Sequence, residues 1–157
     1  MMISKTSQYA LQAMIYLATL EPEVKVTGND IARKLGLPPS YLSSIMPQLT
    51  GQGLAKSTPG PGGGFSLGRP ASDINLLHIL SITENSIFTQ ECLLGFKVCD
   101  PTTKCPVHDH WHPIKTSLIT FLEKQTLELL GGAVKSGKYQ IHELPYTQEI
   151  QAGDVPS

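Results

Sequence analysis

The sequence is poor in several features that define common classes of protein. Only three of its 157 residues are cysteines, too few for the disulfide scaffold of a small secreted domain. No uninterrupted apolar run approaches the roughly 18 residues that a membrane-spanning helix needs. Gln8 and Gln12 interrupt the first apolar stretch, which also lacks the pattern of a signal peptide. We therefore expect about one cytoplasmic domain that does not contact a membrane.

Charge is scarce and unevenly divided along the chain. The formal net charge is −1, but residues 1–70 carry six basic and three acidic side chains, a net charge of +3. The remaining residues carry six basic and ten acidic side chains, a net charge of −4. A mildly basic first part permits binding to nucleic acid without requiring it.

Helical periodicity dominates the first fifty residues. An amphipathic helix is predicted over residues 4–20. A second, short helix follows the capping residue Thr27 and ends at Gly36. A third helix runs from Pro39 toward residue 52, where Pro47 predicts a kink or early fraying. Two short helices joined by a glycine-containing turn indicate a helix-turn-helix.

A glycine-rich hairpin follows the third helix. Residues 54–58 and 65–67 resemble short strands, and the loop 59–64 between them contains four glycines and two prolines. A further short helix is predicted over 75–83. The pattern is that of a mainly α fold with a small β-hairpin wing, so residues 1–83 are expected to form a winged helix-turn-helix domain.

The rest of the chain contains a loop, a long helix and a tail. Residues 84–106 are a predicted loop that holds all three cysteines. The helix, expected over 107–130, has Pro113 either at its start or at a kink, and Gly131-Gly132 at its end. Its apolar stripe needs a partner surface, which predicts homodimerisation. Residues 131–157 are expected to be a loose tail. The stripe comprises Trp111, Ile114, Leu118, Phe121, Leu122 and Leu129.

The third helix has a polar face suited to reading DNA. Its short hydrogen-bonding side chains can reach phosphates and base edges, and nearby basic residues can contact phosphates. Consecutive glycines let the wing backbone approach a phosphate closely. No kinase or hydrolase motif is present, so we expect a binding protein and not an enzyme. The candidate DNA-binding residues are Lys5, Arg33, Lys34, Ser40, Tyr41, Ser43, Ser44, Gln48, Lys56, Gly62 and Gly63.

The three cysteines fall within fourteen residues. Cys92, Cys99 and Cys105 are followed by His108, so three thiolates and an imidazole on one short segment can surround a metal centre. Gaps of six and five residues favour an iron–sulfur cluster. A structural zinc ion is the alternative, although its cysteine pairs usually lie closer together. His110 and His112 are expected to point away from His108.

Several segments resemble the Rrf-type family of winged-helix transcriptional regulators, which includes IscR- and NsrR-like iron–sulfur regulators. The resemblance covers roughly residues 1–130, and the wing followed by a three-cysteine loop is its most specific part. It implies a homodimeric regulator of transcription, usually a repressor, that binds a pseudo-palindromic DNA operator. The segments are Ser4-Lys5, Tyr9-Ala10-Leu11, Ala13-Met14, Asp30-Ile31-Ala32, Ser40-Tyr41-Leu42 and Gly60-Pro61-Gly62-Gly63-Gly64-Phe65-Ser66-Leu67-Gly68.

The resemblance also implies a ligand set. Cys92, Cys99 and Cys105 match the family's cluster cysteines, and His108 matches the histidine that completes a [2Fe-2S] site. A [2Fe-2S] cluster is favoured and a [4Fe-4S] cluster stays possible. Binding is expected to order an otherwise mobile loop and so to switch DNA binding in response to redox state, nitric oxide or iron–sulfur supply.

Three positions depart from the family's pattern. Gln8, a poor iron ligand, stands near a position from which some relatives supply a carboxylate, which favours His108. Pro59 replaces an arginine of IscR-like wings, and Ser43 replaces an acidic residue connected with operator choice. The operator sequence is therefore left open.

Overall fold

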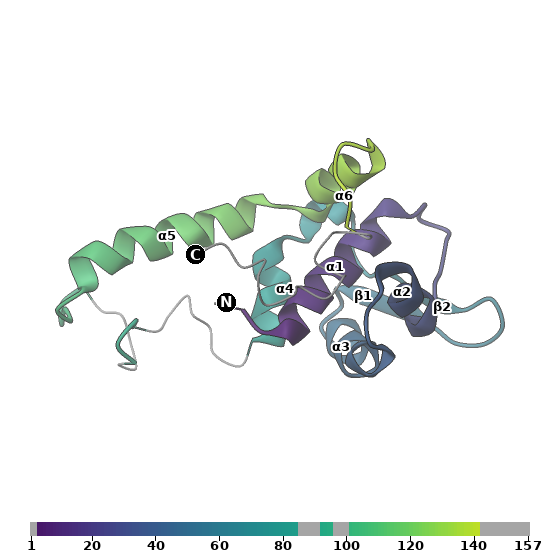
Figure 1. Cartoon of the computed structure of the whole chain (residues 1–157), viewed down its shortest axis with the longest axis horizontal. Coiled ribbons are helices and arrows are strands. Elements are labelled where there is room, and N and C mark those ends of the chain that lie inside the picture. The colour runs from purple at the N-terminus through teal and green to yellow at the C-terminus, as the bar shows by residue number, and fades with distance from the viewer. Residues whose placement is uncertain (1–2, 85–91, 96–100, 142–157) are drawn as a thin grey trace, which may run out of the picture.

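The computed structural model describes residues 3–84, 92–95 and 101–141 (Figure 1). Helices make up most of the described chain, and a two-stranded hairpin lies between the third and fourth of them. The elements are α1 (Lys5–Thr19), α2 (Gly28–Leu35), α3 (Pro39–Gly51), β1 (Ala55–Thr58), β2 (Gly64–Leu67), the 3-10 turn η1 (Ala71–Asp73), α4 (Leu76–Thr83), α5 (His108–Lys124) and α6 (Leu127–Lys135).

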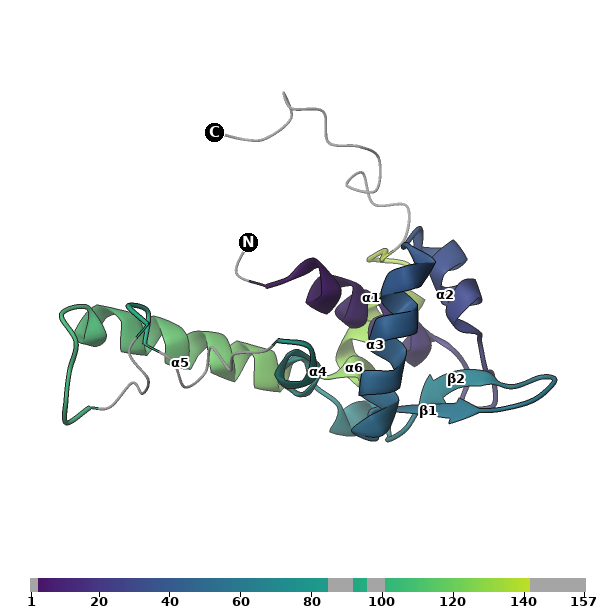
Figure 2. The ribbon, with the colours of Figure 1, turned by 90° about the horizontal axis from the view of Figure 1, so that it is seen from below.

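The order of elements confirms the predicted winged helix. Helices α1, α2 and α3 pack together, and β1 pairs antiparallel with β2, so that Ala55 opposes Leu67 and Thr58 opposes Gly64. An isolated bridge between Val26 and Phe65 adds a short third edge to the hairpin. The wing and α5 project to opposite sides of the helical body (Figures 1 and 2).

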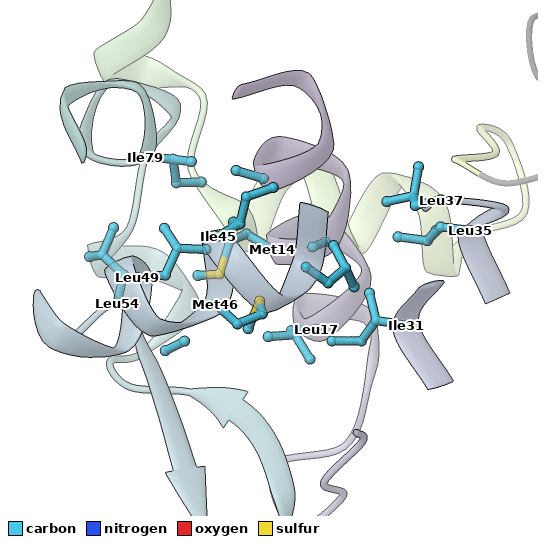
Figure 3. Close-up of a cluster of buried hydrophobic side chains, with 14 of the residues drawn as sticks. Met14, Leu17, Ile31, Leu35, Leu37, Ile45, Met46, Leu49, Leu54 and Ile79 are labelled. Atoms are coloured by element: carbon cyan, nitrogen blue, oxygen red, sulfur yellow. The ribbon is translucent and has the colours of Figure 1, made fainter. Parts of the chain in front are cut away.

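The core lies between α1, α2, α3 and the base of the wing. Met14, Ile31, Ile45 and Leu49 are completely buried there (Figure 3). Leu127 joins the same cluster from α6, far along the sequence. Because each of these side chains removes apolar surface from water, the first three helices share one continuous core, to which α6 also contributes.

Local capping explains where the early helices begin and end. The Ser4 hydroxyl accepts a hydrogen bond from the backbone N–H of Ser7 and starts α1. Thr27 starts α2 through a capping box: its hydroxyl accepts from the N–H of Asp30, and the Asp30 carboxylate accepts from the N–H of Thr27. Gly36 ends α2 in the left-handed conformation, with φ of 66°. These boundaries confirm the sequence prediction.

Helix α3 continues through Pro47 as far as Gly51, so the predicted early fraying does not occur. Proline cannot donate a hydrogen bond to the carbonyl of Ser43. The helix is held nonetheless by its buried side, on which Met46 and Leu49 flank the proline and pack into the core.

Helix α4 begins at Asn75, which caps the N–H of His78. Its C-terminal end is attached to the start of α1. Glu84 accepts hydrogen bonds from the N–H of Ser4 at 2.8 Å and from its hydroxyl at 3.0 Å, and the hydroxyls of Ser7 and Thr83 lie 2.7 Å apart. Two segments about eighty residues apart in sequence therefore meet in one polar contact.

The predicted long helix is in fact two helices. α5 ends at Lys124, and α6 begins at Leu127 after the capping residue Thr126. Backbone pairing causes the break, because the N–H of Leu76 donates to Gln125 and the N–H of Leu127 donates to Ile74. The single helix predicted over 107–130 is therefore wrong in its extent.

The glycine pair Gly131-Gly132 lies inside α6, so the prediction that it ends a helix is wrong as well. A Cβ on Gly131 would lie 3.0 Å from Ala18 of α1, whereas one on Gly132 would meet nothing within 4 Å. Gly131 permits α6 to approach α1 closely. Part of the tail predicted over 131–157 is thus packed helix, and residues 142–157 lie outside the described part of the chain.

Helix α5 begins at His108 and contains Pro113 in its second turn, so Pro113 does not start it. It extends away from the helical body (Figures 1 and 2). Part of its apolar stripe is open to solvent, with Ile114 59% exposed and Phe121 52% exposed, whereas Leu122 is buried. Within the described segments, none of the helices has the length and apolar character needed to cross a membrane.

Candidate functional site

Helix α3 presents opposite faces to the core and to solvent. The apolar stripe predicted for it is buried, which confirms the orientation of the helix. The predicted DNA-reading side chains of α3 are all exposed, on the side away from that stripe. They are Ser40, Tyr41, Ser43, Ser44 and Gln48.

The exposed polar groups of α3 already make local hydrogen bonds. The Ser43 hydroxyl donates to the carbonyl of Pro39 at 3.2 Å, and the Gln48 amide nitrogen donates to the carbonyl of Ser44 at 3.1 Å. Each side chain can make further hydrogen bonds, since the Ser43 hydroxyl can still accept one and the Gln48 amide still has one N–H and its oxygen. Both can exchange these bonds for contacts to DNA without burying an unpaired group.

Tyr41 has a structural contact that the sequence did not reveal. Its ring meets that of Tyr9 on α1 edge to face, with 4.9 Å between the ring centres. This geometry is favourable for aromatic pairs. The contact fixes the first turn of α3 against α1, while Tyr41 stays 36% exposed. Tyr41 can therefore serve both in packing and at a surface.

The predicted basic residues are all exposed but come from three elements. Lys5 lies on the first turn of α1, Arg33 and Lys34 lie on the last turn of α2, and Lys56 lies on β1. Arg33 forms an ion pair with Asp30 at 2.6 Å. Hydrogen bonds from Thr27 and the charge of Arg33 lower the pKa of Asp30, so the carboxylate stays charged and partly neutralises Arg33.

The tip of the wing needs its glycines for the turn itself. Gly62 has φ of 74°, and a Cβ on Gly63 would lie only 2.1 Å from the carbonyl oxygen of Thr58. A side chain at Gly63 would therefore collide with backbone. The predicted close approach of the wing to a phosphate stays a prediction, while the tight turn is a sufficient reason for glycine at both positions.

Two of the predicted cluster cysteines lie together. The Sγ atoms of Cys92 and Cys105 are 3.3 Å apart, although the two residues lie thirteen positions apart in sequence. This distance is greater than that of a disulfide, so no disulfide joins the two cysteines. Cys92 is only 7% exposed, and Cys105 is half-buried. Cys99 lies outside the described residues.

His108 lies next to this cysteine pair in the chain and is buried, with 5% of its surface exposed. Its backbone N–H donates to the carbonyl of Cys105 at 3.0 Å, so the first turn of α5 begins directly at the third cysteine. The predicted fourth ligand is thus held at a fixed place relative to Cys105.

His112 lies against His108, contrary to the prediction that it points away. The two rings stack with 5.1 Å between their centres and 15° between their planes. Residues four apart lie on one face of a helix, so the spacing itself could have revealed this contact. His112 is exposed and covers one face of the buried His108 ring.

Two other polar groups lie near the start of α5, one in an ion pair and one buried. Asp109 forms an ion pair with Lys104 at 2.8 Å, and this hydrogen-bonded cation lowers the pKa of Asp109. The buried Nε1–H of Trp111 has no hydrogen-bond partner among the described residues. No group of three His, Cys, Asp or Glu side chains suited to a metal ion occurs in segments 3–84, 92–95 and 101–141.

Comparison with known proteins agrees with this architecture. Residues 3–132 match the family model Rrf2, described as an iron-dependent transcriptional regulator. The chain is 32% identical over 159 aligned positions to the HTH-type transcriptional regulator IscR of Escherichia coli O1:K1 / APEC, covering 99% of this chain and 98% of the relative. These relatives are transcriptional regulators and not enzymes.

Solved structures include two informative neighbours. CymR (YrzC), the global cysteine regulator of B. subtilis, superposes with a TM-score of 0.72 at 28% identity, over 84% of this chain and 97% of CymR. IscR from T. potens superposes with a TM-score of 0.69 at 28% identity, over 89% of this chain and 93% of IscR. The chain therefore belongs to the Rrf2 family of DNA-binding, winged-helix transcriptional regulators.

Proposed function

We propose that this regulator binds a pseudo-palindromic DNA operator as a homodimer in the cytoplasm, and that an iron–sulfur cluster controls this binding. The ligands are Cys92, Cys99, Cys105 and His108. The observation that carries the proposal is the contact between the Cys92 and Cys105 thiols at 3.3 Å, directly before the buried His108. Repression of transcription is the expected outcome.

The donor set fits a cluster. Soft thiols and an imidazole are ligands that iron–sulfur centres use, so the histidine beside the cysteine pair can complete the set. The family fold is shared with a regulator described as IscR and with one described as a cysteine regulator. The fold alone therefore does not imply a cluster, and the case depends on the cysteines and His108.

A bound cluster would supply a redox-sensitive cross-link between the segment at Cys92 and the start of α5. The chain's own contacts connect that place to the DNA-binding surface. The far end of α5 is fixed to α4 by the hydrogen bonds of Leu76 with Gln125 and of Leu127 with Ile74. Helix α4 in turn packs on α1 and α3. A change in the position of α5 would therefore reach the recognition helix through packed elements.

The DNA-binding surface supports recognition in the major groove. An exposed polar face on α3 can reach base edges, and Lys5, Lys34 and Lys56 can contact phosphates. A dimer would place two α3 helices in half-sites whose centres lie about 34–36 Å apart, or a multiple of this. Binding should weaken steeply as salt rises, because released counterions contribute much of the affinity.

The first experiment is anaerobic purification followed by a visible spectrum and by iron and acid-labile sulfide analysis. We expect a coloured protein, and the spectrum would separate a [2Fe-2S] from a [4Fe-4S] cluster. Cys105→Ser and His108→Ala should reduce cluster content. His110→Ala is the matched control for the histidine, because His110 is exposed on the same turn. A colourless protein with stoichiometric zinc would favour the alternative, a zinc-stabilised regulator without redox sensing.

The second experiment tests the coupling between the site and DNA. Footprinting with loaded and cluster-free protein should show different operator affinities for the wild type. The Cys105→Ser variant should give one affinity under both conditions. Equal affinities for loaded and cluster-free wild type would refute the switch while leaving DNA binding intact.

A further inference from the structure

The structure assigns Cys92 and Cys105 as a thiol pair that forms an intramolecular disulfide when no cluster is bound. This inference rests on the proposed function only in using two of the same cysteines. Its basis is the 3.3 Å separation of the two Sγ atoms. Rotation of one thiol about its Cα–Cβ bond changes such a separation by more than the roughly 1.3 Å needed to reach the length of a disulfide.

Backbone hydrogen bonds hold both cysteines in place. The N–H of Gly95 donates to the carbonyl of Cys92 at 2.9 Å, closing a tight turn in which Gly95 has φ of 84°. The N–H of His108 donates to the carbonyl of Cys105 at 3.0 Å. Each cysteine is thus the first residue of a closed turn, one of which starts α5.

The two cysteines differ in their exposure to solvent and therefore in their reactivity. Cys105 is half-buried, so its thiol can react with a small oxidant from solution, whereas Cys92 is 7% exposed and cannot easily do so. Cys105 is therefore the cysteine that is attacked from outside, and Cys92 is the resolving cysteine that lies beside it. This arrangement favours an internal disulfide over a lasting adduct with the oxidant.

The oxidant is a low-molecular-weight disulfide. The Cys105 sulfur attacks one of its sulfur atoms, the external S–S bond breaks, and one small thiol leaves with the Cys105 proton. The Cys92 sulfur then attacks Cys105 of the mixed disulfide. A second small thiol leaves with the Cys92 proton, and the Cys92–Cys105 bond forms. Two protein thiols are oxidised, and one external disulfide is reduced to two thiols.

The disulfide excludes metal binding by the same pair, because a ligating cysteine must be a thiolate. Oxidised protein should therefore take up no cluster until a reductant opens the bond. The modification would keep a cluster-free molecule in a protected, reversible state, since sulfur in a disulfide is shielded from oxidation to sulfinic or sulfonic acid.

Peptide mapping tests the assignment directly. The full-length chain is stripped of metal by EDTA under reduction, desalted without oxygen and treated with oxidised glutathione. Lys97 and Lys104 separate the three cysteines, so trypsin places each on a different peptide. We expect one cross-link, between the peptides of Cys92 and Cys105. Cross-links to Cys99, disulfide-linked dimers or stable glutathione adducts on the wild type would overturn the assignment.

Variants provide the matched controls. Cys99→Ser should form the disulfide as the wild type does, whereas Cys92→Ser and Cys105→Ser should lose it. Cys92→Ser should accumulate glutathione on Cys105. In concentrated urea the wild type should lose its selectivity for the Cys92–Cys105 pair, and unchanged selectivity there would show that the fold does not select it.

Cluster uptake separates this inference from the proposed function. Oxidised wild type is supplied with iron and sulfide, with and without a thiol reductant. If the protein takes up a cluster only after its disulfide has been reduced, both the proposed function and the thiol-pair assignment are supported. If reduced protein takes up no cluster, the proposed function fails, while the mapped disulfide still decides the thiol-pair assignment. Uptake by protein that keeps its disulfide would contradict the exclusion of metal binding.

Discussion

The DNA-binding domain and α5 treat their apolar side chains in opposite ways. In α1, α2 and α3 the apolar residues are buried, as Met14 and Leu49 show. In α5 part of the corresponding stripe faces solvent: Ile114 and Phe121 are more than half exposed, while Leu122 is buried. The first region buries its apolar residues in one core, to which Leu127 of α6 also contributes. The second leaves apolar side chains on its surface, where we propose that a second copy of the chain binds.

The polar groups differ in the same way. In the DNA-binding domain, Ser4 and Thr27 cap helix ends within their own neighbourhood. At the start of α5 the capping position is Val107, which has no side-chain hydrogen bond. Trp111 nearby keeps a buried N–H without a partner among the described residues. The cysteine end of α5 thus lacks the side-chain capping that starts α1 and α2.

Core truncation should give the largest effect and should break the DNA-binding domain alone. Leu49→Ala removes a fully buried side chain and should lower the free energy of unfolding by about 2–5 kcal/mol. Phe121→Ala, on the exposed stripe, should change it by no more than about 0.5 kcal/mol in the monomer. Urea denaturation at low protein concentration measures both. Equal losses for the two variants would mean that α5 belongs to the same core.

A charged side chain on the apolar stripe of α5 should weaken dimerisation without changing the fold of the monomer. Ile114→Asp places a carboxylate among apolar side chains that a second copy would cover, and should weaken the dimer by about 2 kcal/mol, roughly thirtyfold in Kd. Thr116→Asp is the control, because Thr116 is exposed on the opposite side of α5. Sedimentation velocity measures the dimer, and far-ultraviolet circular dichroism measures helix content. A dimer that tolerates Ile114→Asp would place the interface elsewhere.

Local chemistry made much of the fold predictable from sequence. Thr27 and Gly36 mark the ends of α2 through rules that involve only neighbouring residues. The glycine-rich loop likewise predicted the hairpin, since Gly63 has no room for a side chain. The proximity of Cys92 and Cys105 could be expected from their short separation, and the structure brings them together.

Contacts between distant segments were not predictable in this way. The break after Lys124 depends on hydrogen bonds from the 74–76 segment, which sequence periodicity does not contain. Gly131 appeared to be a helix end because glycine usually is one, but it serves the approach of α6 to α1. The Tyr9–Tyr41 contact depends on tertiary packing as well. His112 was missed although its four-residue spacing was visible.

The two glycines of α6 allow a matched test of how closely α6 packs on α1. Gly132→Ala meets nothing within 4 Å and should raise the free energy of unfolding by about 0.5–1 kcal/mol through higher helix propensity. Gly131→Ala gains the same propensity but places a methyl group 3.0 Å from Ala18, so it should be less stable than Gly132→Ala. Thermal unfolding of the pair measures the difference. Equal stabilisation would show that α1 and α6 separate without cost.

Glu84, which attaches the end of α4 to α1, should give the smallest effect, visible only through pH. Burial opposes its charge, but hydrogen bonds from Ser7 and Ser4 outweigh this and lower its pKa below the ordinary 4.5. The stabilisation is therefore complete above pH 4.5 and is lost as pH falls through the lowered pKa of the folded state. Glu84→Gln should be less stable than the wild type near pH 6. Urea denaturation at several pH values should show that this difference in the free energy of unfolding disappears in acid. A difference in stability that stays the same in acid would show that the carboxylate charge does not contribute to the contact.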